Sequence, residues 1–232
     1  CHLHYLTGRA EERLSFDLQP EIAERMGYRD RGGQLGVERF MKRYFLVAKD
    51  VGTLTRILAA KLEAQEKKKP EGLMRFLPQR APKPLEDAPG FVIDAGRISV
   101  GDETVLADDP VNMVRLFVLA AREDVDVHPD ALWAVTRHLG KFRPDLRRTP
   151  EASEALLAAI LEGDRPAQTL KRMNEAGVLG KALPEFGGIV AQTQFNMYHH
   201  FTVDEHTLRA VERISDIEHG RVEGLKLARD VF

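Results

Sequence analysis

The sequence predicts a mainly α-helical protein, a helical bundle with one small β-hairpin. Two observations predict the helices: apolar residues recur at helical spacing along most of the chain, and several of these segments begin with a capping residue followed by proline. The one credible pair of strands is the short stretch 91–100. With 232 residues, 43% of them hydrophobic and 30% charged, the chain can bury one sizeable core or two smaller ones.

The first part of the chain contains two predicted helices. One covers residues 14–27 and ends at Gly27, and a longer one runs from about residue 35 to residue 68. Apolar residues follow the longer helix at alternating spacings of four and three, and others widen the stripe, so this helix should pack within a bundle. The stripe contains Val37, Phe40, Met41, Tyr44, Val47, Ala48, Val51, Leu54, Ile57, Leu58 and Leu62.

Five prolines then interrupt the chain, and residues 70–89 are predicted to form an extended linker that protease should cut first. The hairpin follows, with strands at 91–94 and 98–100 around Gly96, and a further strand is expected at 104–107.

Beyond the hairpin, helices return with clear start signals. Asp109, His128 and Thr149 each precede a proline and are predicted N-caps, and Pro166 opens a further helix. The pair Asp108 and Asp109 is interpreted as part of a cap rather than as a pair of metal-binding carboxylates.

The segment 196–209 crowds three histidines near the start of a predicted helix. Thr202 and Glu205 have the spacing of a capping box, in which the hydroxyl and the carboxylate satisfy the free N–H groups of the first turn. This cap places His206 on the first helical turn, where one imidazole nitrogen can point outward at a fixed angle.

Two interpretations of His206 follow. It is a metal ligand if His199 and His200 in the entering loop, or other residues, converge with it. It is a packing residue if it pairs with Phe201 as a hydrophobic staple. A metal site needs several ligands, and this segment guarantees one, so the residues alone leave both interpretations open.

Residues 198–209, preceded by 177–187, resemble the bifunctional uridylyltransferase and uridylyl-removing enzymes that act on the PII nitrogen-signalling protein. The resemblance extends upstream through 6–19 and 38–45. It implies an order of parts: a nucleotidyltransferase domain, this helical region, a metal-dependent HD hydrolase domain, and two small ligand-sensing ACT domains.

The resemblance also implies two opposed reactions. In one, UTP and magnesium modify a tyrosine of PII with release of pyrophosphate. In the other, a divalent metal in the HD domain activates water to remove the uridylyl group. His206 would be the first ligand of that HD site. Glutamine is the expected effector of the parent enzyme.

On this basis we divide the chain into four parts. Residues 1–69 follow the nucleotidyltransferase core, 70–89 form the linker, 90–195 combine the hairpin with a helical region, and 196–232 begin a truncated HD domain. We expect an internal fragment, because no Met precedes Cys1 and no stop signal follows Phe232. The fragment itself should be inactive, because it contains no Gly-Ser turn with clustered aspartates to hold a triphosphate and magnesium.

The nucleotide-binding candidates are cationic and aromatic residues near the expected nucleotidyltransferase core. Each must be weighed against the ordinary role of a solvated surface charge. They are Arg9, Arg13, Lys42 and Tyr44.

Composition excludes several other classes. A net charge of -2 gives no general attraction to nucleic acid, and the longest apolar run, 116–121, is too short to cross a membrane. With a single cysteine and no signal peptide, a cytoplasmic location is expected. Two alternatives remain. The chain could be the helical region of a glutamine synthetase adenylyltransferase, but that enzyme lacks an HD domain, and the motif at residues 198–209 argues against it. The chain could also be a non-catalytic helical scaffold or interaction module.

Overall fold

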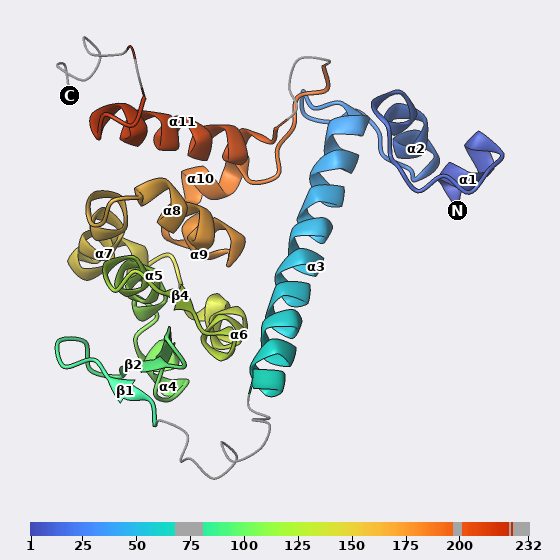
Figure 1. Cartoon of the computed structure of the whole chain (residues 1–232). Helices are drawn as coiled ribbons and strands as arrows, with labels where there is room; N and C mark the ends of the chain where they lie inside the picture. Colours follow the sequence, from blue (N-terminus) through green and yellow to red (C-terminus); the bar gives the residue numbers. More distant parts are fainter. Residues whose placement is uncertain (68–80, 197–200, 223, 225–232) are drawn as a thin grey trace. The chain divides into compact units, whose positions relative to one another are not determined.

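The computed structural model describes residues 1–67, 81–196, 201–222 and 224. These residues are mainly helical with one small sheet, which confirms the predicted fold class (Figure 1). Two compact units divide the chain: the first unit contains 1–51 and 188–207, and the second unit contains 52–187 and 208–232. In the described part of the chain, no helix has the length and apolar character needed to span a bilayer.

The first unit has its own small core. Helix α1 (His2–Thr7), the 3-10 turn η1 (Phe16–Leu18), helix α2 (Gln19–Arg25) and the start of α3 (Gly36–Lys67) surround it. The helix predicted at 14–27 is shorter than expected, because Pro20 lies at the start of α2, where the missing N–H costs least. The buried residues of this core are Ile22, Ala23, Val37, Phe40 and Met41.

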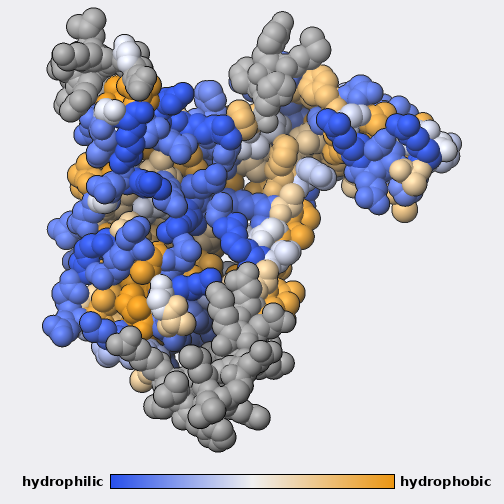
Figure 2. Space-filling view, in the orientation of Figure 1, coloured by the Kyte–Doolittle hydropathy of each residue, from blue (hydrophilic) through white to orange (hydrophobic). Residues whose placement is uncertain are grey.

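Helix α3 confirms the long helix predicted over about 35–68. Its apolar stripe is not fully packed, however. Val37, Phe40 and Ile57 are buried, whereas Val51 and Leu58 are 57% and 59% exposed. Figure 2 shows hydrophobic residues on the surface over this helix. The expectation that the whole stripe is buried in a bundle was therefore wrong between Tyr44 and Leu62, where Ile57 is buried but most of the other stripe residues are exposed.

The second unit contains a sheet of order β1-β2-β3-β4. Strands β2 (Phe91–Asp94) and β3 (Arg97–Val100) form the predicted antiparallel hairpin. Strand β1 (Lys83–Pro84), within the predicted linker, pairs with β2, and β4 (Asp126–Val127) lies parallel to β3. Residues 70–80 of that linker lie outside the described residues.

The strand predicted at 104–107 was wrong, because the structure has helix α4 (Thr104–Asp108) there. Asp102 accepts a hydrogen bond from the Thr104 N–H at 2.8 Å and so satisfies one donor at the start of this helix. That local bond outweighs the strand preference of Thr104 and Val105.

Helix α5 (Asn112–Arg122) is the centre of the second unit, and seven of its eleven residues are buried. It contacts α7, α8, α9 and the sheet. The helices around it and those that follow are α6 (Pro129–His138), α7 (Pro150–Leu161), α8 (Pro166–Glu175), α9 (Val178–Ala182), α10 (Pro184–Ile189) and α11 (Val203–Glu218), with 3-10 turns η3 (Leu139–Lys141) and η4 (Leu146–Arg148).

Two of the three predicted caps are confirmed. His128 Nδ1 accepts from the Asp130 N–H at 3.2 Å, and Thr149 Oγ1 accepts from the Ala152 N–H at 3.3 Å. Asp109 was wrongly predicted to be an N-cap, because α5 begins later, at Asn112.

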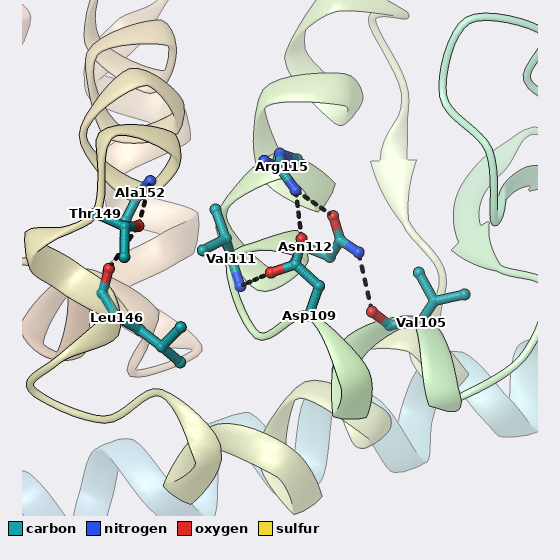
Figure 3. A network of polar contacts seen from close by, with 8 residues as sticks. All are labelled: Val105, Asp109, Val111, Asn112, Arg115, Leu146, Thr149 and Ala152. Atoms are coloured by element: carbon teal, nitrogen blue, oxygen red, sulfur yellow. Dashed lines mark hydrogen bonds and ion pairs between the residues drawn. The ribbon is translucent and has the colours of Figure 1, made fainter.

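Figure 3 shows what Asp109 does instead. One of its oxygens accepts from the Val111 N–H at 3.1 Å, and the other pairs with the Arg115 guanidinium at 2.7 Å. Asn112 donates to the Val105 carbonyl at 2.9 Å and so ties α5 to α4. This network holds the turn before the central helix.

Candidate functional site

The sequence-predicted site residues all belong to the first unit. Within this unit, the segment that enters α11 is joined to the start of α3. The Phe195 N–H donates to Glu38 Oε1 at 3.1 Å, and the Phe195 ring stacks on Phe16 with 4.2 Å between centroids. The other Glu38 oxygen accepts from the Leu35 N–H at 3.1 Å. One carboxylate thus caps α3 and holds a segment far away in the sequence.

Glu38 was missed as an organising residue, although a signal for it was present. It lies at the third position of α3, where a glutamate reaches back to a free N–H group at the helix start. Its second partner, Phe195, could not be found from local sequence.

Arg9 and Arg13 are grouped around Glu11. The Arg9 guanidinium pairs with Glu11 Oε2 at 3.0 Å, and the Arg13 N–H donates to Glu11 Oε1 at 2.9 Å. The hydrogen bond from Arg13, assisted by the charge of Arg9, holds the pKa of the Glu11 carboxyl below its ordinary value. The side chain of Arg9 is 75% exposed, so its guanidinium remains accessible to a solute.

Lys42 and Tyr44 lie on α3. The Lys42 ammonium donates to the Gly188 carbonyl at 3.1 Å, which gives it a structural role. Tyr44 lies against Phe45, edge to face with 5.6 Å between centroids, and the residue is 45% exposed. In the part of the chain that the structure describes, no hydrogen bond or ion pair joins these two residues to Arg9 or Arg13.

Helix α11 begins at Val203, as predicted, and its start is fixed by two hydrogen bonds. The Val203 N–H donates to the Gln192 carbonyl at 2.8 Å, and the Ala191 N–H donates to Asp204 Oδ1 at 3.1 Å. Asp204 is only 6% exposed, so this carboxylate is part of the interior. The backbone around His206 is therefore held in one place.

His206 is the fourth residue of α11, and its side chain is exposed. His199 and His200 lie outside the described residues. Among the described residues, no three His, Cys, Asp or Glu side chains gather as metal ligands. This part of the chain thus provides one accessible imidazole on a fixed helical turn, and the interpretation of His206 as a metal ligand stays a prediction.

Comparison with known proteins gives these positions a family context. A family model described as GlnD PII-uridylyltransferase matches residues 1–59, and a second, described as uridylyltransferase GlnD third domain, matches residues 91–181. A bifunctional uridylyltransferase/uridylyl-removing enzyme of Caulobacter vibrioides (strain NA1000 / CB15N) is 56% identical over 224 residues, which is 96% of this chain.

The chain belongs to the bifunctional uridylyltransferase/uridylyl-removing enzyme family. A second member, from Phenylobacterium zucineum (strain HLK1), is 57% identical over 225 residues, again 96% of this chain. The chain spans 24% of the length of these two relatives. No solved structure matches the chain.

Only the first of the two matched ranges contains candidate residues. Arg9, Arg13, Lys42 and Tyr44 lie within the first matched range, 1–59. His206 lies beyond the second, which ends at residue 181. The family-model matches therefore bear on the nucleotide-binding candidates more directly than on the metal-ligand candidate.

Proposed function

We propose that the whole protein transfers a uridylyl group from UTP to the PII signal protein and removes it again in a second reaction. The observation that carries this proposal is the identity of 56% over 96% of the chain to an enzyme named for both reactions. The description of the family model matching residues 1–59, a PII-uridylyltransferase, supports PII as the protein substrate.

In the transfer reaction, a tyrosine oxygen of PII attacks the α-phosphorus of UTP, and pyrophosphate leaves. The charge on the phosphates must be neutralised and the reactants aligned, tasks that magnesium and cationic side chains share. Arg9 and Arg13 are the residues of this chain that we assign to the nucleotide phosphates. Arg9 is exposed and oriented by Glu11, and a guanidinium can hold two phosphate oxygens at once.

In the removal reaction, we assign His206 as one ligand of a divalent metal. Its exposed imidazole on the fixed first turn of α11 fits one ligand position, and the described residues provide no complete set. When bound, the metal would supply an activated water for hydrolysis. The contribution of this chain is to hold the His206 backbone in place through Asp204 and Val203.

Two further assignments accompany this proposal. We assign glutamine as the effector of the whole protein and the cytoplasm as its location. Glutamine is the effector that the family resemblance implies, and the cytoplasm is the ordinary location for a chain with a single cysteine. Adding glutamine to the two activity assays tests the first assignment, and cell fractionation tests the second.

The test is a pair of activities measured on one preparation of the whole protein. His206→Ala should abolish uridylyl removal and leave uridylyl transfer within about twofold, because the two reactions use separate metal sites. His4→Ala, which removes another exposed histidine of the first unit, should leave both activities intact. If removal survives His206→Ala, the metal assignment is wrong and His206 is a packing residue.

A further inference from the structure

The second unit contains a cavity of about 310 Å³ that none of the assignments above uses. It is bordered by the second half of α3, by α6 and α8, and by strands β3 and β4. Its apolar wall includes the buried residues Ile57, Phe117 and Val127. This volume lies at the lower end of the range usual for small-molecule sites.

Two carboxylates line the cavity, and each already has a cationic partner. Glu175 pairs with Arg56, and Asp126 pairs with Arg172 at 2.5 Å. The Thr53 hydroxyl also donates to the Glu175 carbonyl at 3.1 Å. These contacts join α3 to α8 and α8 to β4, so the cavity wall is held by the protein itself. Because both carboxylates are already paired, neither is free to bind a cationic ligand.

A third arginine in the lining, Arg97, has no such partner. It lies beside Asp126 in the parallel β3–β4 register, so the two side chains share one face of the sheet. Asp126 Oδ1 is already bonded to Arg172. Within the described ranges, no side chain forms a hydrogen bond or ion pair with the Arg97 guanidinium. The lining thus has one positive charge in excess.

We propose that this cavity binds a small organic anion. The anionic group, a carboxylate or a phosphate monoester, is held by the fork of N–H donors on Arg97. The apolar body of the ligand lies against Ile57 and Phe117. A triphosphate is disfavoured, because the single unpaired arginine would leave most of its negative charge unneutralised. The proposal does not depend on the proposed function.

Calorimetric titration of the whole protein tests this proposal with three probes. Phenylacetate and phenyl phosphate each combine an anionic group with an apolar ring, whereas inorganic phosphate has no apolar body. We expect at least one of the two organic anions to bind with a Kd below about 1 mM, and inorganic phosphate to bind at least about tenfold more weakly. Binding of only one organic anion identifies the carboxylate or the phosphate monoester as the preferred group.

Variants locate the binding. Arg97→Gln should raise the Kd of the organic anion by about tenfold or more. Arg97→Lys should raise the Kd less, because lysine keeps the positive charge but loses the fork of N–H donors. Arg143→Gln, an exposed arginine of the same unit outside the lining, should change nothing. Circular dichroism of each variant checks that it is folded. The proposal is overturned if neither organic anion binds, or if folded Arg97→Gln and Arg97→Lys both bind like the unmodified protein.

Discussion

Two cations of the first unit differ in how the fold uses them. The Lys42 ammonium is bonded to the Gly188 carbonyl at 3.1 Å. Arg13 donates its backbone N–H to Glu11, and no hydrogen bond or ion pair within the described residues occupies its guanidinium. The sequence gives the two residues equal rank, because a sequence pattern cannot show which side chain is already hydrogen-bonded to a backbone carbonyl. The structure makes Arg13 the better nucleotide candidate of the two.

A substitution can test that ranking. Arg13→Gln in the whole protein should raise the KM for UTP by about tenfold, because one charge-assisted contact to phosphate is lost. Uridylyl removal should stay unchanged. Arg31→Gln, at an exposed arginine of the same unit, serves as the control. An unchanged KM for UTP in Arg13→Gln would remove this residue from the nucleotide site.

Asp102 gives a pH prediction at the same scale. The hydrogen bonds from Thr104, from its side chain and its backbone N–H, hold the pKa of this carboxyl below its ordinary value of 3.8. Because the folded pKa is the lower one, the stabilisation is present above the unfolded value and is lost as pH falls through the folded value. Carboxyl NMR titration should show Asp102 ionising below 3.8, and Thr104→Val should move its pKa upward. A Thr104→Val variant that titrates like the unmodified chain would contradict the hydrogen-bond explanation.

At the scale of elements, the sequence predicts what local chemistry decides. The bounds of α3 and the hairpin around Gly96 follow from spacing and turn residues, and both were predicted closely. Helix α4 was missed because Thr104 and Val105 favour strands, although Asp102 carried a helix-start signal. The cavity beside Arg97 was also missed, because it depends on the pairing of β3 with β4, which no local pattern encodes.

The approach of α9 to α10 rests on one glycine. A Cβ added at Gly187 would lie 2.6 Å from the Gly180 carbonyl oxygen, whereas one added at Gly188 would meet nothing within 4 Å. Gly187→Ala should therefore destabilise the chain by about 1–3 kcal/mol, because backbone must move. Gly188→Ala should be neutral or stabilising by up to about 1 kcal/mol, because alanine favours a helix over glycine. Urea unfolding of both variants measures the difference, and equal midpoints would contradict this packing.

At the scale of the whole molecule, chain order and spatial grouping differ. The first unit combines 1–51 with 188–207, and hydrogen bonds such as that from Phe195 to Glu38 hold these segments together. Arg9, Arg13 and His206 thus belong to one unit, although the sequence suggested separate domains for the nucleotide and metal candidates. Hydrophobic patterns identify which residues are apolar, but not which distant segment completes a core. The four-part division of the chain remains a prediction.

The 232-residue chain by itself should neither transfer uridylyl groups to PII nor remove them. Its sequence has no Gly-Ser turn with clustered aspartates for a magnesium triphosphate, and its described residues offer no group of three metal ligands. Radiolabelled UTP and uridylylated PII provide the two assays, with the whole protein as the positive control. Because the cavity beside Arg97 lies within the second unit, the same inactive chain should still bind the organic anion. Measurable uridylyl transfer by the chain alone would show that these residues contain a complete transferase site.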